Sequence, residues 1–189
     1  SYSIGCVTID PNNTNIIWVG TGENNNQRSV AYGDGIYKSL DGGKSWKNMG
    51  LNKSEHIGNI LVHPNNSDVV YVSAYGPLWN DGGDRGIYKT EDGGNTWNKI
   101  LYIDKHTGFN EIHMDPRNPD VLYAASHQRR RHVYTYVGGG PGSGLHKSTD
   151  GGLTWKVINK GLPNVEIGRI GMDISDANPE IIYAIVEAA

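Results

Sequence analysis

The chain has 189 residues and a net charge of −3, with 26 Gly and 11 Tyr but a single Phe and three Met. A near-neutral charge provides no basic surface for nucleic acid, and no apolar run approaches the roughly 20 residues of a membrane-spanning helix. One cysteine, Cys6, rules out an internal disulfide. The glycines, tyrosines and frequent Asn-containing turns are typical of many short strands joined by tight turns.

The first predicted elements are two strands joined by a Pro-Asn turn at residues 10–13, where the second strand begins with an apolar run at 16–19. Three further copies of this pattern follow along the chain. Their turns and apolar runs lie at 63–66 and 69–72, at 115–118 and 121–124, and, more loosely, at 176–179 and 181–184. Recurrence at such intervals indicates an internal repeat.

A second motif alternates with the first. Residues 35–46 read Gly-Ile-Tyr-Lys-Ser-Leu-Asp-Gly-Gly-Lys-Ser-Trp, and residues 86–97 and 144–155 align with them without gaps. The aspartates of the three copies, Asp41, Asp92 and Asp150, are 51 and 58 residues apart. Each copy predicts a strand, a tight Asp-Gly-Gly turn and a further strand.

Together the two motifs predict a unit of four short strands. In the second unit these are residues 57–62, 69–73 and 86–90, and a strand that begins at Thr96-Trp97. Units of about 50 residues with four strands are typical of propeller blades. The sequence therefore predicts an all-β fold without helices of consequence, a partial β-propeller with four-stranded antiparallel blades. We expect one domain with three full blades and half a blade, at approximately 1–50, 51–102, 103–160 and 161–189.

The Asp-Gly-Gly turn has a physical rationale. Its second glycine tolerates the positive φ of a tight hairpin, and the aspartate carboxylate can accept hydrogen bonds from turn amides. Ser or Thr hydroxyls can tie the strand ends together, and the tryptophan offers a large apolar surface for packing. We therefore assign a structural role to nine turn residues: Asp41, Gly43, Trp46, Asp92, Gly94, Trp97, Asp150, Gly152 and Trp155.

The pattern Ser39-x-Asp41-x-Gly43-x-Ser45-Trp46 and its two counterparts resemble the Asp-box, or BNR, repeat. That repeat occurs in sialidases, in xyloglucanase-type glycoside hydrolases and in sortilin and other VPS10-domain receptors. The spacing and the wording Gly-Ile-Tyr-Lys-Ser-x-Asp-Gly-Gly are most similar to large secreted bacterial proteins of the sortilin/VPS10-like group, often labelled glycosyl hydrolases. The resemblance implies a secreted, periplasmic or cell-surface protein. Since the box is structural in these families, it implies no activity by itself.

The number of units bears on how the ring closes. Closed propellers usually have at least four blades, and the repeats here make three and a half. A half blade would leave an unpaired strand edge, which natural proteins avoid. We therefore expect a fragment of a longer protein, or closure of the ring by its remaining blades or by another chain.

Strand alternation places all Pro-Asn turns and all Asp-Gly-Gly turns on one face of the disc. The longer, dissimilar segments fall on the other face: loops 22–34, 75–85 and 126–143, and links 47–56, 98–107 and 156–166. Because variable loops on a rigid scaffold commonly carry function, we expect ligands on this second face. Its candidate ligand-binding residues are Trp79, Arg85, Arg129, Arg131, Tyr134 and Tyr136.

Each of these candidates has a structural alternative. Aromatic side chains such as Trp79 stack on sugar rings or peptide side chains, but they also pack beneath long loops. The run Arg129-Arg130-Arg131 offers a clamp for a carboxylate or phosphate. Successive strand residues point to opposite faces, however, so the sequence favours a solvated loop or a salt-bridged edge.

The sequence supports two functions. It favours a non-enzymatic binding or scaffold module for a protein, peptide or glycan, because no catalytic set stands out. The alternative is a sialidase- or xyloglucanase-like glycoside hydrolase, which needs two carboxylates about 5–9.5 Å apart. The acidic candidates are Glu23, Asp81, Asp84 and Glu111.

Glu111 is distinguished among them by its place in the repeat. Counting back from the turn prolines aligns it with Cys6 and Asn59 on inner strands, so we expect it to face the central channel. No cofactor is expected. Residues 81–84 read Asp-Gly-Gly-Asp without the ligand spacing of a calcium loop, and no metal site is predicted.

Overall fold

The structure is a computed structural model that describes residues 3–25 and 27–189. Within these ranges the chain forms strands, turns and loops and no helix, which confirms the predicted all-β class. Consequently, the described residues hold no helix with the length and apolarity needed to cross a bilayer.

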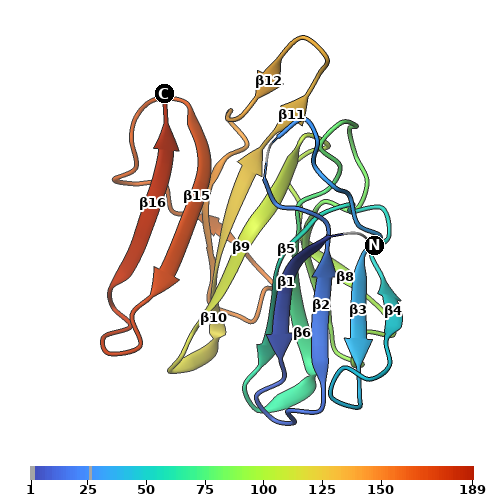
Figure 1. Cartoon of the computed structure of the whole chain (residues 1–189). Coiled ribbons are helices and arrows are strands. Elements are labelled where there is room, and N and C mark those ends of the chain that lie inside the picture. Colours follow the sequence, from blue (N-terminus) through green and yellow to red (C-terminus); the bar gives the residue numbers. More distant parts are fainter. Residues whose placement is uncertain (1–2, 26) are drawn as a thin grey trace.

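Three four-stranded antiparallel sheets lie in succession, followed by a two-stranded one (Figure 1). The first sheet contains β1 (Ile4–Ile9), β2 (Ile17–Thr21), β3 (Ile36–Ser39) and β4 (Lys47–Gly50). The second contains β5 (Ile57–His63), β6 (Asn66–Ala74), β7 (Gly86–Thr90) and β8 (Asn98–Leu101). The third contains β9 (Thr107–Asp115), β10 (Asn118–Gln128), β13 (Gly144–Ser148) and β14 (Lys156–Val157). The fourth is the pair β15 (Ile167–Ile174) and β16 (Ile182–Ala188).

This succession confirms the predicted partial propeller of three blades and half a fourth. A small separate hairpin, β11 (Arg130–Arg131) with β12 (Tyr136–Val137), projects from the third sheet (Figure 1). The division into a single domain with the blade limits given above stays a prediction.

The fourth strand of the second sheet begins later than predicted. The sequence placed its start at Thr96-Trp97, whereas β8 starts at Asn98. The reason is local, because Thr96 belongs to the turn: its N–H and its hydroxyl donate to the two carboxylate oxygens of Asp92, at 2.9 and 2.6 Å. Ladder pairing resumes only where Lys89 meets Asn98.

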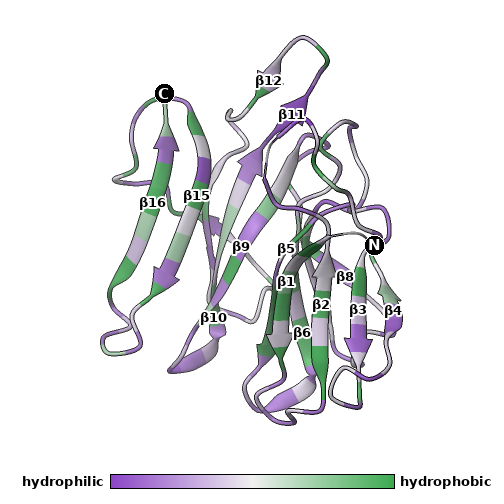
Figure 2. Cartoon of the chain, in the orientation of Figure 1, coloured by the Kyte–Doolittle hydropathy of each residue, from purple (hydrophilic) through white to green (hydrophobic). Residues whose placement is uncertain are grey.

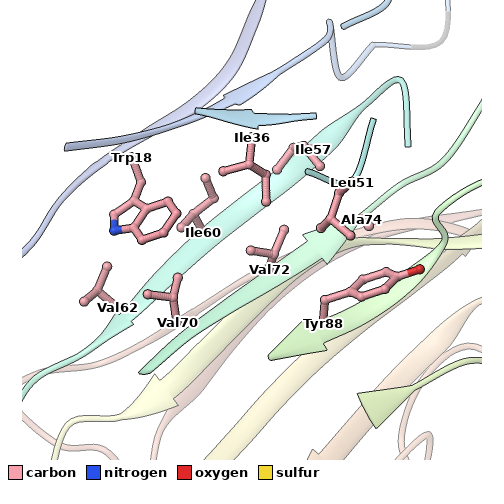
Figure 3. Close-up of a cluster of buried hydrophobic side chains, with 10 residues drawn as sticks. All are labelled: Trp18, Ile36, Leu51, Ile57, Ile60, Val62, Val70, Val72, Ala74 and Tyr88. Carbon is pink, nitrogen blue, oxygen red and sulfur yellow. The ribbon is translucent and has the colours of Figure 1, made fainter. Parts of the chain in front are cut away.

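Apolar side chains fill the space between successive sheets. Between the first two sheets, Trp18 and Ile36 pack against residues of β5 and β6 such as Ile60 and Val72 (Figure 3). Along β5 the buried positions Ile57, Ile60 and Val62 are separated by more exposed ones, whereas β6 is buried continuously from Val70 to Ala74 because both of its faces are covered. Trp18 is fully buried, and its truncation to alanine would cost about 3–5 kcal/mol of stability.

The three Asp-Gly-Gly turns share one hydrogen-bond pattern. In the turn of the first sheet, one carboxylate oxygen of Asp41 accepts the Ser39 hydroxyl (2.8 Å) and the Ser45 N–H (2.9 Å). The other accepts the Ser45 hydroxyl at 2.6 Å. These bonds, led by that of the Ser45 hydroxyl, lower the pKa of Asp41 to about 2. The turns around Asp92 and Asp150 repeat the pattern.

The first and the last strand of the chain, β1 and β16, carry exposed apolar side chains. On β1 these are Ile4, Val7 and Ile9, and near or on β16 they are Ile181, Tyr183 and Ile185. Figure 2 shows apolar residues on both strands, β1 in the first sheet and β16 in the last. In the described part of the chain, β16 pairs with β15 on one side and with no strand on the other.

Candidate functional site

The long loops and the links meet at one end of the sheets, while the Asp-Gly-Gly turns lie at the other (Figure 1). Main-chain bonds join loops to links there: Gly33 N–H donates to Glu55 O at 2.7 Å, and Tyr75 N–H donates to His56 O at 2.9 Å. We call this end the loop face; it consists of residues 22–25, 27–34, 51–56, 75–85, 102–107, 126–143 and 159–166. Its candidate residues separate into a buried floor and an exposed rim.

Arg85 belongs to the floor. Its side chain is fully buried, and its guanidinium donates to the carbonyl oxygens of Tyr75 (2.9 Å), Asn80 (3.0 Å) and Pro77. Burial, together with the nearby Arg129, lowers the pKa of Arg85 to about 10, so it stays charged at neutral pH. A guanidinium that holds three carbonyls of its own loop fixes the shape of that loop, and it presents no surface to a ligand of this chain.

Arg129 is buried as well, and this corrects the interpretation of the arginine run as a solvated loop or salt-bridged edge. Its side chain has no exposed surface; the Cζ atom lies 3.4 Å from the centre of the Tyr75 ring, and the guanidinium donates to Asn25 O at 3.2 Å. Loops of three sheets therefore surround it, since Asn25 belongs to the first loop, Tyr75 to the second and Arg129 itself to the third. Arg130 and Arg131 are half-buried, so the description as an edge fits only these two.

A hydrogen-bonded chain of aromatic groups completes the floor. The Tyr75 hydroxyl is bonded to Nδ1 of His127, and Nε2 of His127 lies 3.0 Å from Gly138 O. Because only a protonated Nε2 can donate to a carbonyl, Nδ1 accepts from the tyrosine. Burial lowers the pKa of His127 to about 4 and raises that of Tyr75, so both groups are neutral at pH 7. This chain ties the second loop to the third.

The rim surrounds a hollow of about 310 Å³, lined by Asp81, His106, Gln128, Arg129, Arg130, His132 and Val137. Asp81 forms an ion pair with Arg130, and its oxygens lie 3.0 Å from His106 Nδ1 and 3.4 Å from Lys105 Nζ. Although burial opposes it, Arg130, His106 and Lys105 lower the pKa of Asp81. The hollow is therefore lined by a hydrogen-bond donor, Arg130, by an acceptor, Asp81, and by the imidazole groups of His106 and His132.

The β11–β12 hairpin forms one wall of this hollow. At its tip Tyr134 is 84% exposed and stacks on His132, with ring centres 5.6 Å apart and planes at 15°. At its base Arg131 lies over the Tyr136 ring, 4.5 Å from its centre. Of the predicted ligand-binding residues, Arg131, Tyr134 and Tyr136 thus share one hairpin, whereas Trp79 is half-buried in the loop before β7.

Two of the acidic candidates stabilise loop conformation. Glu23 accepts the Ala31 N–H at 2.9 Å within the first loop. Asp84 accepts the Lys53 N–H at 3.0 Å and so connects the second loop to the link before β5. Asp81 and Asp84 therefore bind different partners. Among the residues that the structure describes, no group of three or more Asp, Glu, His or Cys side chains is arranged to hold a metal ion.

Glu111 lies in β9, the edge strand of the third sheet that contacts β5 and β15. Such first strands are joined across sheets by side-chain bonds, since Asn59 Nδ2 donates to Ile112 O at 3.1 Å. Glu111 lies 3.2 Å from His113 Nε2, and Nδ1 of that histidine is 3.9 Å from Asp173. The acidic candidates are thus divided between the loop face and the row of first strands.

Sequence reasoning missed Glu55, in the link between the first two sheets. It is a non-glycine residue with a φ of +63°, in the left-handed region that L-residues avoid. Burial raises the pKa of its carboxyl, partly offset by Arg85. Strained backbone and a perturbed carboxyl commonly mark functional positions. No motif precedes it, so only the folded backbone could identify it.

Comparison with known proteins places these features in context. The sequence model of the Sortilin-Vps10 family, described as "Sortilin, neurotensin receptor 3", matches residues 34–186. No curated protein matches the chain.

Solved structures of GH74 enzymes have a similar fold. An ancestral GH74 enzyme superposes with a TM-score of 0.68 at 19% identity, over 96% of this chain and 21% of that one. The GH74 xyloglucanase of Xanthomonas campestris gives 0.56 at 23% identity, over 82% and 21%. The GH74 enzyme of Niastella koreensis gives 0.57 at 21% identity, over 93% and 25%. At these identities the likeness concerns the fold alone, and the chain spans a quarter or less of each structure.

Proposed function

Since the chain belongs to the Sortilin-Vps10 family over residues 34–186, we propose that it is a binding module of a secreted, periplasmic or cell-surface propeller. Its ligand is a segment of protein, peptide or glycan held on the loop face. The observation that carries this proposal is the β11–β12 hairpin, which presents the exposed Tyr134 beside a hollow lined by Asp81, His106 and Arg130.

The chemistry of the site supports binding through mixed contacts. An exposed tyrosine ring offers an apolar face for a sugar ring or an apolar side chain. Beside it, Arg130 donates and Asp81 accepts hydrogen bonds, so ligand hydroxyls, amides and carboxylates all find partners. The buried floor of Arg85, Arg129 and His127 holds these loops in place. Such preorganisation reduces the entropy lost on binding.

Binding is tested by probing the purified chain against an oligosaccharide array and a peptide array, and then by titration calorimetry with the best probe. Tyr134→Ala should weaken binding about tenfold, because a stacking contact contributes on the order of 1 kcal/mol and orders the hairpin. Tyr183→Ala serves as the control, since Tyr183 is also exposed but lies on β16. Equal affinity of the two variants, or no bound probe on either array, would contradict the proposal.

A glycoside hydrolase is the alternative, and the resemblance of the fold to GH74 enzymes favours it. Hydrolysis needs one carboxyl that keeps its proton near neutral pH and a second carboxylate. Among the described carboxyls of the loop face, Glu55 has a pKa that is raised, because the side chain is partly buried. Glu55 is therefore the proton donor in this alternative. The second carboxylate of this alternative is Asp84, which accepts the N–H of Lys53, two residues before Glu55.

Turnover distinguishes the alternatives. The chain is incubated with xyloglucan and with a panel of other polysaccharides, and reducing ends are counted. If the hydrolase reading is right, Glu55→Gln and Asp84→Asn each lower the rate by at least a hundredfold, while Asp173→Asn leaves it unchanged. Absence of turnover together with a measured ligand affinity would eliminate the hydrolase.

A further inference from the structure

The hollow beside the β11–β12 hairpin carries an excess of positive charge. Of the described residues that line it, Asp81 alone is acidic, whereas Arg129 and Arg130 are both cationic at neutral pH. Lys105 adds a third cation beside it, with Nζ 3.4 Å from the Asp81 carboxylate. The described lining comes from the loop before β7, the link before β9 and the loop after β10, so neither β1 nor β16 borders the hollow. The charge of these walls favours an anionic ligand.

Asp81 is the carboxylate on which the cations converge. One of its oxygens is bonded to Arg130 of the hairpin and lies 3.0 Å from His106 Nδ1 of the link. The other oxygen faces Lys105 of the same link. Donors from two separate segments that meet on one carboxylate also suit the carboxylate of a ligand. The side chain of Asp81 thus occupies the position that a bound carboxylate would take.

The contact between Asp81 and Arg130 can be exchanged at little cost. Among the described residues, Asp81 is bonded to the guanidinium through Nη1 alone and Nε has no hydrogen-bond partner, whereas a carboxylate can accept two parallel bonds from an arginine. The Asp81 side chain is 38% exposed, and an ion pair open to water contributes little stability. The main chain beside it is fixed separately, because Gly82 N–H donates to Lys105 O at 2.8 Å. Rotation of the Asp81 side chain therefore suffices to release Arg130.

The aromatic rim indicates what carries the ligand carboxylate. Tyr134 is 84% exposed, and its ring is stacked on that of His132, which lines the hollow. Such a ring offers an apolar face to a sugar ring. A uronate residue presents a ring face and a carboxylate on one rigid unit. An acidic peptide side chain is joined to its backbone by a flexible stem, whose ordering on binding costs free energy.

We propose that the hollow binds an acidic glycan, in which the carboxylate of a uronate residue displaces Asp81 from Arg130 and the sugar ring lies against Tyr134. This inference rests on the proposed binding function and names the class of its ligand. Asp81 acts as an internal substitute for the ligand, because it neutralises Arg130 in the free protein. A neutral sugar does not displace it, so the exchange also provides specificity.

The probes for this proposal are oligomers of galacturonate, glucuronate and mannuronate, each compared with its methyl ester. An acid and its ester share their sugar rings and differ in the charge of the carboxyl groups. In titration calorimetry with the full chain, at least one acid should bind about tenfold or more tightly than its ester. This preference should shrink as NaCl is raised from about 50 to about 500 mM, because salt screens the charges.

Two variants assign the contact. Arg130→Gln should weaken binding of the acid about tenfold, as loss of a charge-assisted hydrogen bond predicts, and leave the affinity for the ester unchanged. Asp81→Asn should strengthen binding of the acid about threefold, because the competing carboxylate is removed. Glu91→Gln is the matched control, since it also removes an exposed carboxylate from an ion pair, that with Lys89 beside the Asp-Gly-Gly turn; it should bind as the parent chain does.

The outcomes separate this inference from the proposed function. Equal affinity for acid and ester, no binding of any of the three acids, or tighter binding of hexaglutamate than of every uronate would overturn the acidic glycan while another array ligand still supports a binding module. Weaker binding by Asp81→Asn would show that Asp81 assists the ligand, and it would overturn the exchange, as would unchanged binding by Arg130→Gln. Failure of all probes on both arrays contradicts the binding module itself.

Discussion

At the scale of single residues, hydrogen bonding controls the acidity of the turns. The carboxylates of Asp41, Asp92 and Asp150 each accept a hydroxyl and an amide from the residue four positions later. These bonds are stronger with the ionised form, which is why each pKa is lowered to about 2. The folded pKa is below the value of 3.8 for a free aspartate, so the unfolded chain takes up protons first.

We predict that acid weakens the fold through these turns. Their contribution to stability is complete above pH 4 and is lost as the pH falls from about 4 to 2. Asp92→Asn should therefore lower the urea midpoint at pH 5, with a difference from the parent chain that shrinks toward pH 2. Urea titrations at half-unit intervals measure this, and Asp176→Asn, in the exposed last turn, is the control. A difference that stays constant with pH would show that the carboxylate charge is not the cause.

At the scale of elements, the hairpin turn and the neighbouring sheet constrain each other. Gly94 has a φ of +96°, and a Cβ placed on it would lie 2.7 Å from Cη2 of the buried Trp18. The turn of one sheet thus rests directly on the core of the preceding sheet. Gly161 has a similar φ of +94°, but nothing lies within 4 Å of its Cβ position.

This pair separates backbone strain from packing. Gly161→Ala should cost about 1–2 kcal/mol, the strain of a left-handed alanine. Gly94→Ala should cost about 1–3 kcal/mol more, because Trp18 must also move. Urea unfolding followed by tryptophan fluorescence measures both free energies. Equal losses for the two variants would mean that the turn does not press on the neighbouring core.

At the scale of the whole molecule, the sheets are unequally supported. The second sheet is packed on both faces, by the core that includes Trp18 on one side and by the core that includes Phe109 on the other. The last strand, β16, is exposed along most of its length and is paired on one side only. Local opening requires least free energy where few apolar contacts are lost.

Hydrogen exchange should reveal this gradient. Under native conditions, amides of β6 should exchange at least a hundredfold more slowly than those of β16, because opening β6 disrupts two cores. Mass spectrometry of peptides that cover 66–74 and 182–188 provides the comparison. Equal rates in the two strands would indicate that the chain opens only as a whole.

The candidate site could be predicted from the sequence only in part. The sequence placed Tyr134, Tyr136 and Arg131 among the ligand-binding residues, and the structure brings them together on one hairpin; their role remains a proposal. It gave no indication that Arg85 and Arg129 are buried, because their burial depends on loops from other sheets. It also missed Glu55, because no local sequence motif marks its positive φ, which only the folded backbone shows.

The sequence by itself determined the fold class, the number of repeats and the family resemblance. Strand alternation and the chemistry of tight turns are local properties, and the same pattern recurs in every repeat. Only the tertiary structure decided what each loop residue does. A loop is shaped by the sheets on either side of it, and neither the burial of a guanidinium nor the partner of a carboxylate is encoded in residues nearby in the chain.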